Sequence, residues 1–593
     1  MIRTKKKFKL LTLAAIAVFT AAAVLGVFGF AARGGGFSLE PQSAAPHARQ
    51  TGVSQRIVNT VIFARFAGEP EWVDEDVLYT YERKYNTSDI SVRSYWEQMS
   101  FGYLDFETRF VAYGGGSFEV SRPRRYFRPR YREINGAVAS PLQVVNPDGY
   151  NNRVFTSRQH GDRPHIDVMY RRQSLLLEIF EGVKHNIDTV GINNSEFSGD
   201  DGLINSVTFV FGGSPDDWGN LLWPHQFRVF FGGENLVNNQ LAELFYIPQG
   251  YWNSHDRNVF MAAGQRRVQL PNFNPLGSSP TVELDGYMMM FDSLNRNVGQ
   301  GDTGQVRDGS GHNLGHLGVA VHETAHILGM PDLYNYADHN NNPMGRWDLM
   351  DNTTPMPQTL NAYFRHRMGW LTDANVPWIR HSGTFSITAS AVAGPDDVIA
   401  YRIISPVYSH EYFMVEFRAR LGPWDGGQFE RRDGRREFTL PGEGLIVYRV
   451  DENVRWGEGN MHGPPNLLEV MRGGRAINDA HLDGARNTSI GSREGVFDAS
   501  LLSFQGSRNR RFAGWNSQIR IYNVRINGDM LTFNVDMPTQ YEAVSPPAFG
   551  FPLLCGGIGG DMPPWQPTMW ISGVLFVGLA VVKIRKKNAG YKI

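Results

Sequence analysis

The segment 321–332, VHETAHILGMPD, constrains this chain more than any other part of its sequence. Residues four apart lie on one face of an α-helix, so His322 and His326 can bind the same metal ion through their imidazole nitrogens. Glu323 lies about 100° further round such a helix than His322. From there its carboxylate can act on a metal-bound water without binding the metal itself. The spacing therefore predicts the helix of a zinc peptidase.

The residues after the histidines predict how this helix ends. Gly329 can form a left-handed cap because it has no Cβ, and Pro331 prevents the helix from resuming. The chain then turns back at Asp332, whose oxygen would complete an open site of three protein ligands plus water. In the alternative interpretation Asp332 caps the turn, and Asp348 or Asp351 binds the metal. The predicted cofactor is one zinc ion per chain.

An apolar stripe supports the helical interpretation. Leu314, Leu317, Val321 and Leu328 recur at helical spacing, about a quarter-turn or more from the two histidines. We expect this stripe to face the core and another face of the helix to line a cleft. The alternative is an ordinary amphipathic helix with surface histidines.

Length and composition limit the class of protein. A chain of 593 residues is too long for one small core, so we expect two or more domains. The net charge of −1 gives no reason to expect a nucleic acid as partner. The only cysteine is Cys555, which excludes an intrachain disulfide and a cysteine-rich metal site.

Both ends of the chain resemble targeting segments. Lysines followed by the apolar run 10–32 are typical of a secretory signal, so 1–32 is predicted to be a signal peptide or an uncleaved signal anchor. A second apolar run with basic residues after it predicts a transmembrane anchor and a basic cytoplasmic tail at 565–593. The alternative for this end is a helix that packs on the protein. The basic flanks indicate that everything between the two ends is extracellular.

Between the ends, the patterns indicate an α+β protein. Residues 33–54 contain glycines and prolines and are predicted to be a linker. Residues 55–375 mix strand and helix patterns. Within this region we expect strands at 57–64, 207–211 and 286–291, and helices at 91–100 and 175–183.

The pattern changes after residue 375. From 376 to 537 the helical periodicity is weak, and a β-sandwich domain is expected. Residues 538–564 are rich in proline and glycine and are interpreted as a stalk. The strand-like runs of the sandwich are 398–404, 411–418, 444–450, 518–524 and 530–535.

Several segments carry a family resemblance. They are SYWEQMSFG at 94–102, LWPH at 222–225, the zinc motif, WDLMD at 347–351, MGWL at 368–371, YFMVEFR at 412–418 and PGEGLIVYRVD at 441–451. Over roughly 55–475 the chain resembles the immune inhibitor A family of secreted bacterial metallopeptidases.

This resemblance implies a zincin-type catalytic domain at 55–375. It implies zinc bound by His322, His326 and Asp332, with Glu323 as the general base. It also implies that Met350 lies in a turn beneath the metal, as the Met-turn of metzincins does. The alternative for Met350 is plain core packing.

Two further segments have weaker functional interpretations. Family members often carry a calcium-binding loop where this chain has 196–205, but several expected carboxylates are missing and Ca²⁺ needs about six to eight oxygens. A surface turn is therefore favoured over a Ca²⁺ site. The run 122–132 interleaves arginines and aromatics, as in proteins that bind anionic polymers, but a solvated loop with arginines stacked on tyrosines is favoured. We interpret His225, His312 and His316 as substrate-cleft or structural histidines rather than as a fourth ligand.

Together these patterns predict a secreted or surface-anchored zinc endopeptidase that acts on protein or peptide substrates. The alternative is a catalytically inactive surface protein that binds or adheres by means of a peptidase scaffold. An aminopeptidase is a weaker interpretation, because nothing in the sequence marks an exopeptidase stop.

Overall fold

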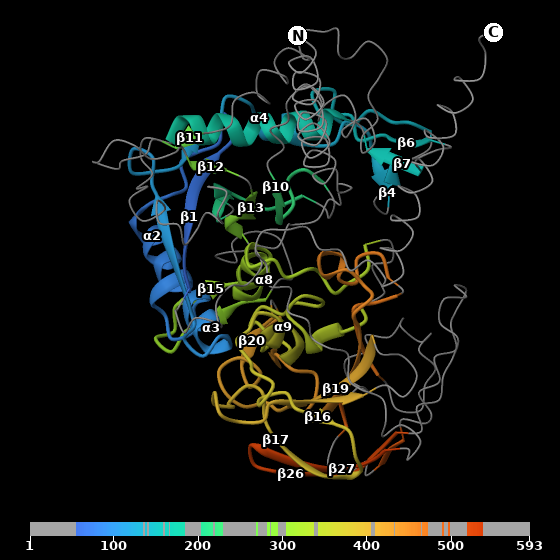
Figure 1. Cartoon of the computed structure of the whole chain (residues 1–593). Coiled ribbons are helices and arrows are strands. Elements are labelled where there is room, and N and C mark those ends of the chain that lie inside the picture. Colours follow the sequence, from blue (N-terminus) through green and yellow to red (C-terminus); the bar gives the residue numbers. More distant parts are fainter. Residues whose placement is uncertain are drawn as a thin grey trace, which may run out of the picture. The chain divides into compact units, whose positions relative to one another are not determined.

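The structure of the chain is a computed structural model (Figure 1). It describes residues 55–134, 137–138, 141–157, 161–164, 166–183, 203–204, 206–216, 220–228, 269–270, 282–284, 286–293, 304–336, 342–404, 410–431, 433–463, 465–471, 489–490, 496–498 and 519–537. The predicted signal, linker, stalk and anchor lie outside these residues, as does most of the loop 196–205. Within the described ranges, we find no helix with the length and apolar character needed to cross a membrane.

The described chain mixes helices and strands, as expected for an α+β protein. The strand order of its first sheet is β10-β13-β9-β1-β2, with β3 beside β1. β1 is parallel to β2, β3 and β9, and β13 is parallel to β9, whereas β10 is antiparallel to β13. The strands are β1 (Gln55–Arg65), β2 (Leu104–Val111), β3 (Phe118–Glu119), β9 (Val207–Phe211), β10 (His225–Arg228) and β13 (Gly286–Phe291). The strands predicted at 57–64, 207–211 and 286–291 are therefore confirmed.

β1 lies in the interior of this sheet because its sequence suits burial on both faces. Val58, Val61, Ile62 and Phe63 are all at most 1% exposed. A run of apolar, mostly β-branched residues is typical of a parallel strand that is covered on both sides.

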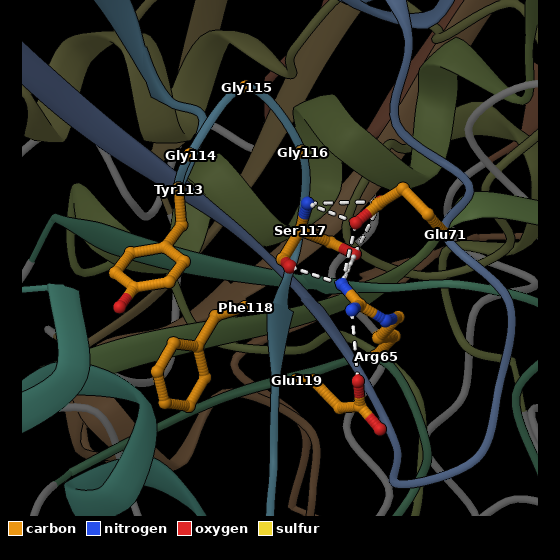
Figure 2. A pocket seen from close by; sticks show the side chains of 9 residues that line it. All are labelled: Arg65, Glu71, Tyr113, Gly114, Gly115, Gly116, Ser117, Phe118 and Glu119. Atoms are coloured by element: carbon orange, nitrogen blue, oxygen red, sulfur yellow. Dashed lines mark hydrogen bonds and ion pairs between the residues drawn. The ribbon is translucent and has the colours of Figure 1, made fainter.

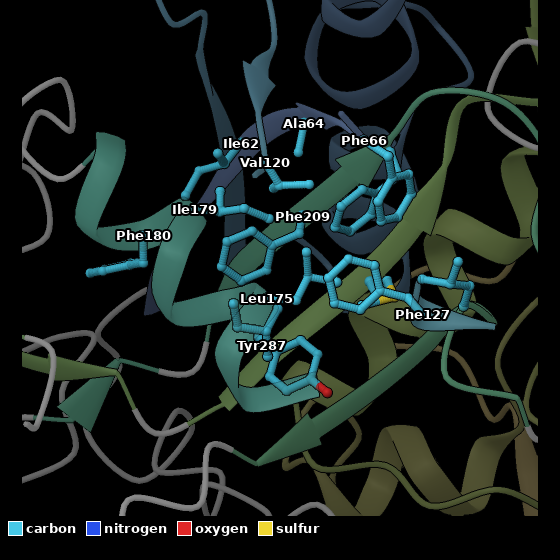
Figure 3. Packing of buried hydrophobic residues seen from close by; sticks show 14 of the residues in the cluster. Ile62, Ala64, Phe66, Val120, Phe127, Leu175, Ile179, Phe180, Phe209 and Tyr287 are labelled. Carbon is cyan, nitrogen blue, oxygen red and sulfur yellow. The ribbon is translucent and has the colours of Figure 1, made fainter. Parts of the chain in front are cut away.

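Helix α4 (Ile166–Val183) covers one face of the sheet. Alternate residues of a strand point to the same face. Phe209 and Tyr287 on this face share one buried cluster with Leu175 and Ile179 of α4 (Figure 3). The helix predicted at 175–183 is the second half of α4.

The opposite face, to which Phe63 points, is covered by α2 (Glu75–Glu82), α3 (Val92–Met99) and α8 (Leu317–Ile327). The ring of Phe63 lies 5.0 Å from that of Tyr81 in α2. The indole of Trp96 in α3 donates to Thr324 Oγ1 of α8 at 2.9 Å. Helix α8 also contacts β10 and β13. The helix predicted at 91–100 is α3, and it begins with a capping box at Ser91.

Downstream, two more sheets share one core. Their orders are β16-β18-β19-β22-β23, with β24 beside β22, and β17-β27-β26-β25. Ile403 and Phe413 of the first sheet lie in the same buried cluster as Ile387 and Phe533 of the second. The strands are β16 (Trp378–Ile379), β17 (Gly383–Thr388), β18 (Ala400–Ile404), β19 (Glu411–Arg418), β22 (Gly444–Asp451), β23 (Leu468–Val470), β24 (Ser489–Ile490), β25 (Val496–Asp498), β26 (Arg520–Asn527) and β27 (Met530–Asp536). All five predicted runs correspond to strands here, namely β18, β19, β22, β26 and β27.

Buried polar contacts join this downstream part to the residues around α8. The guanidinium of Arg418 is 2% exposed and pairs with Asp425 at 2.7 Å. It also donates to the carbonyl oxygens of Trp347 at 2.8 Å and Thr359 at 3.0 Å. The sheet that contains β19 therefore holds the turn that follows Trp347.

The remaining described elements are short. They are η1 (Arg83–Thr87), η2 (Arg124–Phe127), β4 (Glu133–Ile134), β5 (Ala137–Val138), β6 (Val154–Ser157), β7 (Gly161–Pro164), β8 (Leu203–Ile204), β11 (Gln269–Leu270), β12 (Val282–Leu284), β14 (Val306–Arg307), β15 (Asn313–Gly315), η6 (Gly345–Trp347), α9 (Ala362–Arg367), β20 (Gln428–Glu430), β21 (Arg436–Phe438) and η7 (Trp456–Glu458).

One part of the helix prediction is wrong. Leu314 is fully buried, as expected, but it lies in β15 and not in α8. Gly315 adopts a φ of 63°, which ends the strand, and His316 then caps α8. The apolar stripe on the helix therefore begins at Leu317.

Candidate metal centre

Local signals determine where α8 begins and ends. The Nδ1 atom of His316 accepts a hydrogen bond from the Val319 amide at 3.1 Å and caps the first turn. At the other end, Gly329 has a φ of 80°. The Gly329 amide donates to His326 O, and the Met330 amide donates to Ala325 O. This is the Schellman pattern, and it confirms the predicted left-handed glycine cap.

The turn after this cap brings Asp332 back to both histidines. Asp332 Oδ1 lies 3.1 Å from His322 Nε2 and 3.4 Å from His326 Nε2. The two imidazole rings stand at 88° to each other, with their centroids 4.9 Å apart. His322, His326 and Asp332 are 8%, 7% and 4% exposed. The structure thus brings the three predicted ligands together in a buried cluster.

Hydrogen bonds at the far side of each ring determine which nitrogen faces Asp332. His322 Nδ1 lies 2.9 Å from the carbonyl oxygen of Leu349, and His326 Nδ1 lies 2.7 Å from that of Met330. A carbonyl oxygen can only accept, so each Nδ1 carries a proton and donates it. With a metal bound, neutral imidazoles held in this way would present the Nε2 lone pair to the ion, as metal-binding histidines do.

Two of the donor-atom separations are close to those of a zinc site. Zinc binds nitrogen and carboxylate oxygen at about 2.0–2.2 Å with tetrahedral geometry, so its ligand atoms lie about 3.3–3.5 Å apart. The separations between Asp332 Oδ1 and the two Nε2 atoms, 3.1 and 3.4 Å, are close to this range. Apart from these two ring nitrogens, Asp332 Oδ1 is buried without a hydrogen-bond donor among the described residues. A divalent cation among these atoms would satisfy it.

Glu323 follows His322 on α8 and is 6% exposed. Its Oε2 atom is buried and receives no hydrogen bond from the described part of the chain. Burial raises the pKa of Glu323, although the nearby histidines oppose this effect. A carboxylate whose pKa is raised in this way suits proton transfer near neutral pH.

Charge interactions couple the cluster in the metal-free protein. Burial alone would lower the pKa of His322, but the Asp332 carboxylate outweighs it and raises this pKa to about 9. Burial would likewise raise the pKa of Asp332, but the two imidazoles hold it below its usual value. Asp332 therefore stays ionised, as a carboxylate that acts as a ligand must, and a proton on an imidazole or a bound metal ion offsets its charge.

The other two candidate carboxylates have different partners. Asp348 accepts hydrogen bonds from the Met350 amide at 2.7 Å and from Asn361 Nδ2 at 2.6 Å. Asp351 Oδ2 accepts from the amides of Met344 and Gly345, both at 2.7 Å. These bonds hold the 344–351 turn. Among the described residues, neither carboxylate belongs to the cluster that contains the histidines.

The 347–351 turn lies against both sides of the site. Its Leu349 carbonyl accepts the bond from His322 Nδ1. Met350 is fully buried, and its carbonyl accepts a hydrogen bond from the Leu333 amide at 2.7 Å, next to Asp332. The turn therefore orients one histidine and the segment that carries the carboxylate.

Two residues that the sequence did not single out contact the ligands. Tyr336 donates its hydroxyl proton to Asp332 Oδ2 at 2.5 Å. Thr353 Oγ1 lies 3.1 Å from His322 Nδ1 and donates to Leu349 O at 2.6 Å. Neither position belongs to the motif, and both depend on turns whose path the sequence pattern does not specify.

The remaining histidines of interest have structural roles. His225 Nε2 lies 3.0 Å from the hydroxyl of Tyr287, and burial lowers the pKa of His225 to about 3. His316 caps α8. His312 lies 3.7 Å from Asp308 at a half-exposed position. Within the described residues, none of these histidines joins the candidate ligands.

The arginine-rich run 122–132 is largely engaged within the protein. Arg124 pairs with Glu69, Arg125 with Asp148 and Arg128 with Asp216. The ring of Tyr126 lies 5.3 Å from the guanidinium of Arg122 and 4.0 Å from that of Arg171. This geometry matches the interpretation as a loop with arginines stacked on a tyrosine.

A cavity of about 510 Å³ lies beside β1 and the glycine turn at 114–116 (Figure 2). Arg65 pairs with Glu71 at 2.6 Å and with Glu119 at 2.9 Å on its wall. Glu71 also accepts hydrogen bonds from the amide and hydroxyl of Ser117. The charged groups of this cavity are thus paired with one another, and we assign it no chemistry.

No model of a known protein family matches the chain, and no curated protein matches its sequence.

Proposed function

We propose that this protein is a zinc-dependent endopeptidase. One observation carries the proposal, namely the approach of a single carboxylate oxygen of Asp332 to within 3.1 and 3.4 Å of the Nε2 atoms of His322 and His326. The adjacent Glu323, with a buried oxygen that receives no hydrogen bond within the described residues, supplies the base that hydrolysis needs.

The chemistry follows from the donor set. His322, His326 and Asp332 would hold the ion, which when bound lowers the pKa of a water to about 7 and polarises the scissile carbonyl. Glu323 accepts the proton of the attacking water at its carboxylate and returns it to the leaving amine nitrogen. Leu349 and Met330 keep both imidazoles in the tautomer that presents Nε2.

We further propose the finer architecture that the resemblance implies. Residues 55–375 would form a zincin-type catalytic domain and 376–537 a β-sandwich domain, in a member of an immune inhibitor A-like family. The turn at Met350, which bonds to His322 through Leu349 and to Leu333 beside Asp332, supports the first part, and the common core of the two downstream sheets supports the second. Export by the N-terminal signal and membrane attachment through 565–593 complete this proposal.

The competing function is a non-catalytic surface protein on a peptidase scaffold. The low exposure of the site favours it, because Glu323, His322 and His326 are only 6–8% exposed. Against it, a scaffold that had lost catalysis would have no reason to keep the ligands and the base in one cluster.

The test is the Glu323→Gln variant of the full chain. We expect zinc content to stay near one ion per chain and cleavage of a casein-type substrate to fall at least ~10³-fold, because the variant lacks the base but keeps the ligands. Glu97→Gln serves as the control, since Glu97 is an exposed residue of α3, and it should cleave like the wild type. Retained cleavage in Glu323→Gln, or a wild-type protein that binds zinc without any peptidase activity, would reject the enzyme in favour of the binding protein.

A further inference from the structure

Asp332 is the only one of the three candidate ligands that lies outside regular secondary structure. His322 and His326 have their spacing set by α8, whereas residues 331–336 belong to neither a helix nor a strand. A ligand in an irregular segment can be held only by contacts with other parts of the chain. The segments that make those contacts therefore determine the position of Asp332.

Most of the backbone contacts of this segment come from the loop 456–463, far downstream in sequence. The Asn460 amide donates to the carbonyl oxygen of Asp332 itself at 2.9 Å. Asn460 Nδ2 donates to the carbonyl of Leu333 at 2.8 Å, and the Tyr336 amide donates to that of Met461 at 3.0 Å. The loop thus bonds to residues at both ends of the stretch 332–336.

Asn460 also ties this loop to the downstream sheet. Its side-chain amide donates to Leu468 O at 2.7 Å, and its Oδ1 accepts from the Leu468 amide at 3.2 Å. Leu468 begins β23, and Asn460 is fully buried. One side chain therefore connects the backbone beside Asp332 to the sheet that contains β22 and β23.

Gly459 makes the close approach possible. It has a φ of 48°, which disfavours residues with a Cβ. A Cβ at this position would lie 2.2 Å from the carbonyl oxygen of Asp332 and 2.8 Å from Pro331 Cβ. Any larger residue must therefore push the loop and the Asp332 backbone apart.

We propose that the loop 456–463 positions the third metal ligand, so that Asp332 presents its carboxylate to the two imidazoles only while this loop is docked. Gly459 and Asn460 are its positioning residues. The inference rests on the proposed metal site and adds that zinc affinity depends on a loop of the downstream region, outside the histidine motif.

Gly459→Ala in the full chain tests the proposal. Zinc affinity, measured by competition with a chelator, should weaken about 10- to 100-fold, the usual effect of losing support behind a metal ligand. The visible spectrum of the cobalt-substituted protein should also change, because cobalt absorption reports the ligand geometry at the metal. Gly434→Ala is the matched control, since Gly434 has a φ of 78° but nothing within 4 Å of its would-be Cβ. Gly434→Ala should keep the wild-type affinity and cobalt spectrum.

The outcomes separate the two proposals. Wild-type zinc affinity and an unchanged cobalt spectrum in folded Gly459→Ala would overturn the role of the loop while leaving the metal site intact. If Gly459→Ala does not fold, Asn460→Ala decides, because it removes the bonds to Leu333 and Leu468 without a clash, and unchanged zinc affinity there overturns the proposal. A wild-type chain that binds no zinc would instead reject the metal site itself.

Discussion

Lys84 provides a test of the packing around the start of α8. Its side chain is 1% exposed, and its ammonium group donates to the carbonyl oxygen of His316, the residue that caps the helix, at 3.1 Å. Burial lowers the pKa of Lys84 from 10.5 to about 7, and the carboxylate of Asp292 offsets only part of this effect. Replacement of Lys84 by methionine removes the titrating group and keeps a side chain of similar length.

The sign and the size of the effect follow from linkage. Between about pH 7 and 10.5 the unfolded chain keeps a proton on Lys84 that the folded chain has released, so this group makes the free energy of unfolding rise with pH. Over 3.5 pH units, at about 1.4 kcal/mol each, the upper bound of the rise is about 5 kcal/mol. The hydrogen bond to His316 contributes at most about 1.5–3 kcal/mol. Loss of this bond changes the absolute stability of the variant more than its pH dependence.

The assay is denaturant unfolding of metal-free wild type and Lys84→Met from pH 6 to 10.5. The difference in unfolding free energy, wild type minus variant, should rise by several kcal/mol between pH 7 and 10.5 and should be flat below pH 7. Contributions from all other titrating groups cancel in this difference. Parallel curves for the two proteins above pH 7 would refute the reasoning, because they would mean that Lys84 stays protonated in the folded chain.

Two further predictions concern the carboxylates and their partners. Asp332→Asn should lower zinc affinity at least ~100-fold. Asp351→Asn should keep the wild-type zinc affinity and lose about 1–3 kcal/mol of unfolding free energy, since Asp351 holds amides of the turn rather than the metal. The opposite ranking of zinc affinities by chelator competition would make Asp351 the ligand. Tyr336→Phe removes the hydrogen bond to Asp332 Oδ2, so zinc affinity should fall about 10-fold. The thermal unfolding midpoint of the metal-free protein should change by less than about 2 °C. Wild-type zinc affinity in this variant would show that the bond does not support the ligand.

The sequence predicted best what depends on neighbours along the chain. The motif placed His322 and His326 on one face of the helix, and Gly329 ended that helix because glycine adopts a φ of 80° without strain. The helix predicted at 91–100 begins after Ser91, whose capping bonds span only a few residues. These features need one turn of helix and nothing more distant, so pattern and propensity suffice to find them.

The sequence did not predict features that depend on the path of the backbone through turns. Leu314 fitted the helical period, but the φ of Gly315 ended β15 there and delayed the helix to Leu317. Tyr336 could not be assigned a role, because its hydroxyl reaches Asp332 only through the path of an irregular segment. The support from Asn460 could not be foreseen either, since it joins parts of the chain 127 residues apart.

The distribution of these contacts has a thermodynamic consequence for the whole centre. Two ligands come from a local helix, but the third is held by a loop tied to β23, and Arg418 of β19 bonds to Trp347 at the start of the turn that orients His322. A ligand that binds the folded chain but not the unfolded chain stabilises every contact on which its affinity depends. Because coupling between binding and conformation is reciprocal, an ion held by His322, His326 and Asp332 would stabilise the downstream sheets as much as those sheets strengthen its binding. The two proposed domains, which meet near residue 375, would therefore be coupled through the support of the metal centre.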